Sequence, residues 1–214
     1  ISKKFSYKNL LSSSYSMMIT NLSLTILQFS SIIFLGFYSS SKDVGVFTLI
    51  FKISTAVTII LNSVNAIAAP KISELFSFSN RKILNEMILS ITKLTFYTSF
   101  PIILVILLFS NHILFFFNTN QKWIYALYIL LFGQLINVAS GSVGTILNMV
   151  GEHSILKNIT LFSFTINIII NVSLIPFFGI YGAAVASSSS MIIWNILGIY
   201  YIYKKVGLKT YIRL

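Results

Sequence analysis

A run of 46 residues without a charged side chain, from Asn158 to Tyr203, constrains the fold of this chain more than any other feature. As one continuous α-helix it would be about 69 Å long, more than twice the roughly 30 Å hydrocarbon core of a bilayer. The run must therefore turn back on itself, and Pro176, Gly179 and Gly182 supply residues that favour a turn. We predict two transmembrane helices here.

Other apolar runs are also long enough to cross a membrane, which takes about 20 residues. With the two helices above they give six predicted spans, at residues 13–38, 44–70, 92–117, 122–150, 156–177 and 180–203. The intervening segment 71–91 is predicted to be a cytoplasmic helical linker lying partly on the membrane surface. The predicted fold is therefore all-α: a polytopic membrane protein with residues 1–214 in a single six-helix unit.

The composition agrees with this fold, since 56% of the residues are hydrophobic and only 9% are charged, against roughly 25% charged in soluble domains. The net charge of +11 does not indicate a nucleic-acid protein, because the basic residues lie between apolar runs, as in cytoplasmic loops. With six spans, one side of the membrane carries Lys3, Lys4, Lys8, Lys71, Arg81, Lys82, Lys157, Lys204, Lys205, Lys209 and Arg213, and the other only Lys42 and Lys122. This bias predicts that both termini are cytoplasmic.

Several kinds of chemistry have no residues to support them. The chain has no cysteine, and its two histidines, His112 and His153, form no metal-binding pattern. It also lacks a phosphate-binding glycine loop and any legible pair of nucleophile and base. We therefore expect neither an enzyme nor a bound metal or cofactor. The sequence starts at Ile1 without a methionine or a signal peptide, so we expect the C-terminal part of a longer protein.

Lys52 is the only charged residue in the second predicted span. A lysine at the bilayer centre costs roughly 2.5–3.5 kcal/mol, so it needs a partner, water or a functional role. On a helical wheel it shares a face with Thr55, Asn62 and Ser63. This face is a candidate wall of an aqueous cavity that attracts a phosphate. In the alternative, Lys52 reaches the outer interface while Asn62 and Ser63 pack against neighbouring helices.

The last three predicted spans carry further polar or small residues at helical spacing. In the fourth span the candidate cavity residues are Gln134, Asn137, Thr145 and Asn148, on one stripe with Gly141 and Gly144. Both helix packing and substrate contact fit this stripe. In the fifth span the stripe of Thr160, Ser163, Asn167 and Asn171 favours hydrogen bonds between helices, and in the sixth Gly182 and Ala186 favour close packing.

Four segments resemble a known family of transporters. They are VGVFTLIFKIS (44–54), AAPKISELF (68–76), GQLINVASGSVGTILNMVGEHSIL (133–156) and IPFFGIYGAAVASSSSMIIWN (175–195). In this order they resemble the C-terminal half of Wzx-type flippases, which export O-antigen and capsule repeat units. These flippases belong to the MOP superfamily, which also contains the MATE drug exporters.

The resemblance implies one lobe of a MATE-like two-lobe transporter in the bacterial cytoplasmic membrane, working by alternating access. The implied cargo is an undecaprenyl-diphosphate-linked oligosaccharide, with Lys52 at the position of a cavity cation. The implied partners are membrane lipids and the missing N-terminal lobe, and a polysaccharide polymerase is a further candidate. Two alternatives stay open: a cation-coupled multidrug exporter of the MATE type, which would favour an acidic cavity, and a non-transporting membrane scaffold.

Overall fold

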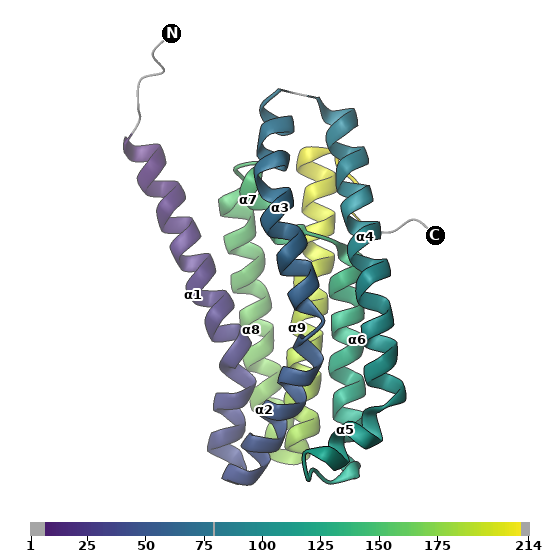
Figure 1. The fold of residues 1–214 in the computed structure, drawn as a ribbon. Helices are drawn as coiled ribbons and strands as arrows, with labels where there is room; N and C mark the ends of the chain where they lie inside the picture. The colour runs from purple at the N-terminus through teal and green to yellow at the C-terminus, as the bar shows by residue number, and fades with distance from the viewer. Residues whose placement is uncertain (1–6, 79, 211–214) are drawn as a thin grey trace.

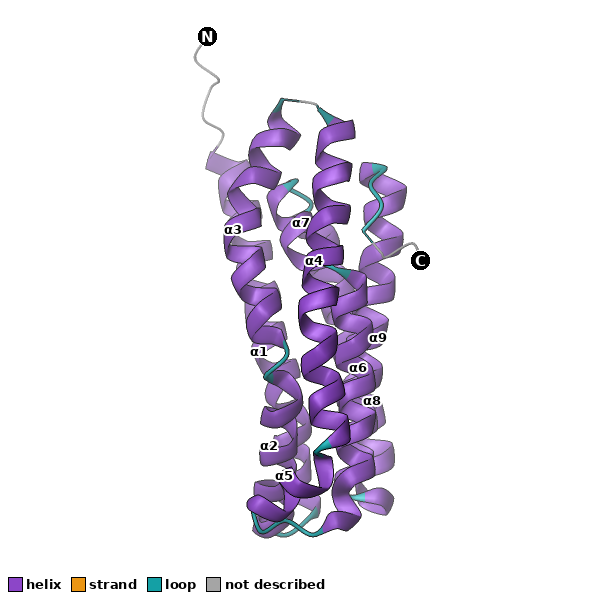
Figure 2. Cartoon of the chain, turned by 45° about the vertical axis from the view of Figure 1, so that its right-hand side comes forward, coloured by secondary structure: helices purple, strands orange, loops and turns teal. Residues whose placement is uncertain are grey.

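The computed structural model describes residues 7–78 and 80–210, and all regular structure in this part of the chain is helical (Figure 2). Lys3, Lys4 and Arg213, which entered the predicted orientation, lie outside the described residues. The elements are α1 (Tyr7–Tyr38), α2 (Ser41–Thr55), α3 (Thr58–Ser77), α4 (Arg81–Leu108), α5 (Ser110–Phe116), the short 3-10 turn η1 (Gln121–Trp123), α6 (Ile124–Ser140), α7 (Val143–Met149), α8 (His153–Phe178), α9 (Ile180–Tyr201) and the π turn η2 (Ile202–Val206).

The long helices run up and down in one bundle (Figure 1). Among the described residues, five segments are long and apolar enough to cross a membrane, and counting the pair α2–α3, bent by 47°, as one broken span gives six. The predicted all-α polytopic fold is thus confirmed. The α3–α4 connection, the start of α8 and the end of α9 lie at one end (Figure 1). We call this the lysine-rich end, since it holds Lys71, Arg81, Lys82, Lys157, Lys204 and Lys205.

The segment 71–91 does not form the separate linker expected from the sequence. Its first residues complete α3, and residues 81–91 form the first turns of α4. Lys71 and Glu74 form an ion pair with 2.9 Å between Nζ and Oε1, on an exposed surface of α3. The helices α3 and α4 therefore extend to a short connection around residue 80, where the Asn80 side chain accepts a hydrogen bond from the Ile83 amide.

The second span is bent between Thr55 and Thr58. The Ala56 amide is shared between the carbonyls of Lys52 and Ile53, at 3.2 and 3.3 Å, so the regular ladder is interrupted. The Thr58 hydroxyl donates to the Thr55 carbonyl at 2.7 Å. The hydroxyl thus gives the Thr55 carbonyl a hydrogen bond at the bend, where hydrocarbon would offer it none.

The fourth span is also interrupted, at Gly141 and Ser142, so the predicted helix 122–150 is two helices, α6 and α7. Gly141 adopts a positive φ of 75°, which favours glycine. A Cβ atom there would lie 2.3 Å from Thr92 Oγ1 and 3.0 Å from the Thr210 carbonyl oxygen. The break therefore needs a residue without a side chain.

The helices α8 and α9 form the hairpin that the charge-free run predicts, and the turn is at Gly179, with φ of 51°. Pro176 lies within the last turn of α8 rather than at the break. Gly182 faces α8 so closely that a Cβ atom would lie 2.7 Å from the Leu174 carbonyl carbon and oxygen. The close packing predicted for this region is thus confirmed.

Gly182→Ala is expected to destabilise the bundle by about 1–3 kcal/mol, because backbone atoms of α8 must move to admit the methyl group. Gly45→Ala is the matched control, since nothing lies within 4 Å of a Cβ at that helical position. We expect Gly45→Ala to be neutral or slightly stabilising. Thermal unfolding of both variants in detergent measures the difference, and equal midpoints would contradict the close contact.

Two apolar cores lie along the bundle. One packs the ends of α1, α4 and α8 with α2, α5 and α6 at the end opposite the lysine-rich end, around Leu35, Phe47 and Leu127. The other packs α3, α7 and the start of α8 at the lysine-rich end, around Ile72, Ile146 and Leu156. Buried polar side chains near the middle of α1, α8 and α9 lie between the two cores.

Candidate functional site

Asn167 lies at the centre of the buried polar layer and uses its full hydrogen-bonding capacity. Its amide donates to the Ala186 carbonyl at 3.2 Å and to the Ser190 hydroxyl at 3.0 Å, both on α9. Its side-chain oxygen accepts from the Ser30 hydroxyl of α1 and from the Asn171 amide of α8. Hydrogen bonds between helices are thus confirmed for Asn167 and for Thr160, which accepts from the Trp194 indole of α9. Asn171 bonds only within α8, and the buried Ser163 hydroxyl has no partner among the described residues.

Two of the candidate cavity residues of the fourth span, Gln134 and Asn137, lie on α6 and contact one another. Gln134 is only 3% exposed, and its side-chain oxygen lies 3.4 Å from the Asn137 amide nitrogen. Asn137 in turn accepts a hydrogen bond of 3.1 Å from the Asn195 amide. These contacts join α6 to α9 inside the lobe, so a cavity role for this pair stays a prediction.

The other two candidates of that span, Thr145 and Asn148, lie on the separate helix α7 and are half-buried. The Asn148 side-chain oxygen lies 3.3 Å from His153 Nδ1, at the start of α8. A Cβ at Gly144 would lie 3.0 Å from Trp194 of α9. The break at Gly141 thus separates the predicted stripe into two parts with different neighbours.

The Lys52 face of α2 and α3 points away from the rest of the lobe. Lys52, Asn62 and Ser63 are exposed and Thr55 is half-buried, whereas Val57 and Leu61 are buried. The Ser63 hydroxyl donates to the Ile59 carbonyl at 2.8 Å, within its own helix. Three of the four residues grouped on the helical wheel are thus exposed, and their role in a cavity stays a prediction. Gln134 is buried and bonds within α6, so it is not part of this exposed face.

Sequence reasoning missed a polar flank on α1, made of Asn21, Thr25 and Gln28, all of which are exposed. Positions four and seven residues apart lie within about 60° of one another on a helix, so these side chains share one flank. The remaining exposed part of α1 is apolar, at Leu22, Ile26, Phe29 and Ile33. The spacing of 21, 25 and 28 was the available signal. An exposed amide at this depth needs water or protein beside it, since hydrocarbon offers no hydrogen bonds.

The helix α8 has the reverse distribution of side chains. Its residues Ser163, Asn167 and Asn171 are buried, and its exposed side carries Leu161, Phe162, Ile169 and Val172. Such a surface is suited to lipid. The lobe therefore has an outer side at α8 that suits hydrocarbon, and exposed polar flanks on α1 and on α2–α3 that suit water or a second protein surface.

The acidic residues of the chain lie away from the apolar parts of these surfaces. All four acidic residues of the chain, Asp43, Glu74, Glu86 and Glu152, lie near helix ends, and none lies in the apolar part of a span. Among the described residues, the ion pair found is Lys71–Glu74, and Lys52 forms none. Within the described residues no group of three potential metal ligands is present. The exposed flank of α2–α3 is thus suited to an anion rather than a cation.

A polar hollow of about 510 Å³ lies at the end opposite the lysine-rich end. It lies between the start of α2 and the loop after α5, and its polar lining includes Lys42, Asp43, Asn118, Asn120 and Lys122. The Lys122 ammonium lies 4.5 Å from the centre of the Trp123 ring. Asn118 has a positive φ of 51°, a conformation that asparagine tolerates better than most residues. The hollow offers amides, two cations, one carboxylate and an aromatic ring together.

Comparison with known proteins assigns this chain to a family. The family model described as MatE matches residues 16–173, well over half of the chain. Neither the curated proteins nor the solved structures contain a significant match. The matched segment begins within α1, includes α2 to α7 and ends within α8. The chain belongs to the MatE family of multi-pass membrane transporters.

Proposed function

We propose that the chain is one lobe of a flippase that moves an undecaprenyl-diphosphate-linked oligosaccharide across the bacterial cytoplasmic membrane. The observation that carries this proposal is Lys52, an exposed cation in an otherwise uncharged span. An ammonium in a poorly hydrated cavity attracts a diphosphate or an acidic sugar strongly, because the low local dielectric weakens screening. The role of Thr55, Asn62 and Ser63 is to offer hydrogen bonds to the same cargo.

The exposed polar flanks of α1 and α2–α3 support a second lobe on that side of the bundle. A cavity between two lobes would give Asn21, Thr25, Gln28 and Lys52 the water or protein partners that hydrocarbon lacks. The arrangement agrees with transporters whose two halves are related by an axis along the membrane normal. The polar hollow near Lys42 and Lys122 would then lie at the outer mouth, where an acidic sugar would leave.

The alternative function is a cation-coupled exporter of drugs, which belongs to the same superfamily. An exporter of cationic drugs needs acidic or aromatic groups in the cavity to offset the charge of the drug. The exposed flanks of α1 and α2–α3 contain no carboxylate in their apolar parts. The sign of the charge therefore favours the flippase over the exporter.

Deletion of the gene tests the proposal against this alternative. We expect loss of surface polysaccharide and accumulation of the lipid-linked repeat unit on the cytoplasmic side, both reversed by the wild-type gene. Susceptibility to cationic drugs is expected to stay unchanged. Surface polysaccharide is measured by immunoblot or gel, and the repeat unit by mass spectrometry of extracted lipids. Normal polysaccharide with increased drug susceptibility would overturn the proposal in favour of the exporter.

A further inference from the structure

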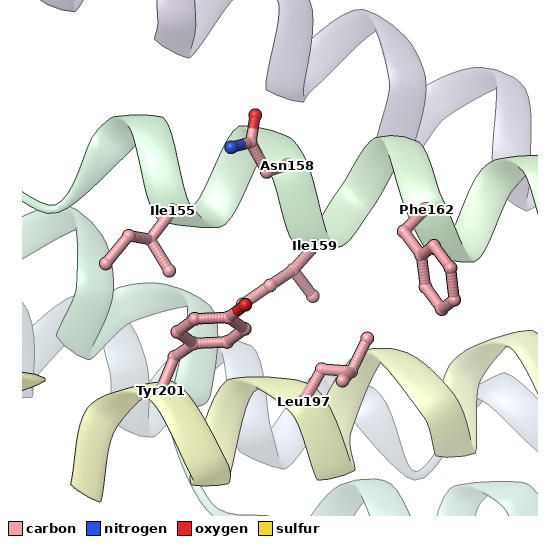
Figure 3. Close-up of a pocket in the computed structure, with 6 residues that line it drawn as sticks. All are labelled: Ile155, Asn158, Ile159, Phe162, Leu197 and Tyr201. Carbon is pink, nitrogen blue, oxygen red and sulfur yellow. The ribbon is translucent and has the colours of Figure 1, made fainter. Parts of the chain in front are cut away.

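A groove of about 360 Å³ lies between α8 and α9, away from the polar flanks described above. Figure 3 shows Ile155, Ile159 and Phe162 of α8 opposite Leu197 and Tyr201 of α9, with the Asn158 amide pointing away from α9. From Ile155 to Phe162 the groove extends about 10 Å along the helix. Its volume is within the usual range of ligand sites, roughly 300–1,000 Å³.

The groove begins at the lysine-rich end and continues into the hydrocarbon region. Tyr201 is the last residue of α9, and η2 follows it directly. Lys204 and Lys205 are exposed and lie three and four residues after Tyr201, so they lie about one helical turn beyond it. The Lys204 ammonium lies 3.3 Å from the Tyr200 hydroxyl and 5.5 Å from the centre of its ring.

These two lysines have no acidic partner in the described part of the chain. Glu152, at the start of α8, forms no ion pair with either of them. The surface therefore combines an apolar groove at membrane depth with two free cations at the adjacent interface. An anionic phospholipid has the complementary parts at the same spacing: acyl chains in the hydrocarbon and a negatively charged headgroup at the interface.

We propose that this groove binds one acyl chain of an anionic phospholipid whose headgroup is held by Lys204 and Lys205. The site goes beyond the proposed function and does not depend on it, since it lies on the lipid-facing side of α8. An apolar transmembrane helix could fill the groove but would bring no negative charge to the two lysines. The polyprenyl cargo carries a similar charge, so it is treated below as a competitor.

The test is native mass spectrometry of the purified full-length protein with equimolar phosphatidylglycerol and phosphatidylethanolamine. Each lysine near an anionic headgroup contributes roughly fivefold in affinity, so we expect phosphatidylglycerol adducts to dominate. The double variant Lys204→Gln, Lys205→Gln is expected to remove this preference. Leu197→Trp is expected to reduce adducts of both lipids severalfold, because the indole fills the groove.

The matched controls are Lys82→Gln, an exposed cation at the same end on α4, and Ile196→Trp, which adds the same indole to an exposed position beside the groove. Both are expected to leave the adducts unchanged. Equal binding of the two lipids by the wild type would overturn the proposal, even if Leu197→Trp fails to fold. An equal effect of Lys82→Gln, or displacement of phosphatidylglycerol by equimolar undecaprenyl phosphate, would overturn it as well.

Discussion

Lys52→Ala is expected to abolish the surface polysaccharide, whereas Lys52→Arg retains it. Loss of one partner from a poorly solvated charge pair costs about 2–5 kcal/mol, which corresponds to at least about thirtyfold in transport rate if the pair forms during translocation. Arginine keeps the positive charge at all relevant pH values. Polysaccharide is measured on whole cells in a deletion strain complemented with each variant, at matched amounts of membrane-inserted protein.

Lys52→Met distinguishes the effect of losing the positive charge from the effect of shortening the side chain. A methionine retains an extended apolar side chain on the exposed surface of α2 but has no ammonium, so it is expected to behave like alanine. Lys82→Ala is the control, because Lys82 is also exposed but lies near the start of α4 at the lysine-rich end. Undiminished polysaccharide in the Lys52→Ala strain would refute the role of this cation in cargo binding.

The six spans could be predicted because charge is excluded from hydrocarbon, so the lengths of the uncharged runs limit the fold directly. The hairpin of α8 and α9 follows from the same limit. The bend at Ala56 and the break at Gly141 could not be predicted, because each changes only one or two residues in an apolar run. The break depends on the contact of Gly141 with Thr92 and Thr210, which are distant in sequence.

The candidate site was predictable only in part, because a helical wheel gives the angles between side chains but not the rotation of the helix in the bundle. Lys52, Asn62 and Ser63 are exposed, whereas Gln134 is buried and Asn137 bonds to Asn195 of α9. Both groups look alike in sequence. Whether a polar face is buried or exposed depends on which helix packs against it. That neighbour is set by packing between helices that are far apart in the chain.

Asn167→Ala is expected to destabilise the bundle strongly without any change of charge. It removes three hydrogen bonds between helices, to Ser30, Ala186 and Ser190, and leaves their groups buried. Hydrogen bonds between membrane helices contribute about 0.6 kcal/mol on average and up to about 1.7. With the small cavity left by the side chain, we expect a loss of roughly 2–4 kcal/mol.

The measurement is unfolding of the purified protein in detergent, with Thr165→Ala as the matched control on the same helix. Thr165 is exposed, and its hydroxyl donates only to the Leu161 carbonyl of α8, so its removal is expected to change stability by less than about 0.5 kcal/mol. Because Asn167 joins α8 to both α1 and α9, its loss is also expected to loosen α1. Labelling of a cysteine introduced at Ser31 should then become faster, since Ser31 is buried and accepts from the Ser187 hydroxyl. Equal stability and equal labelling rates for the two variants would show that the polar layer does not hold these three helices together.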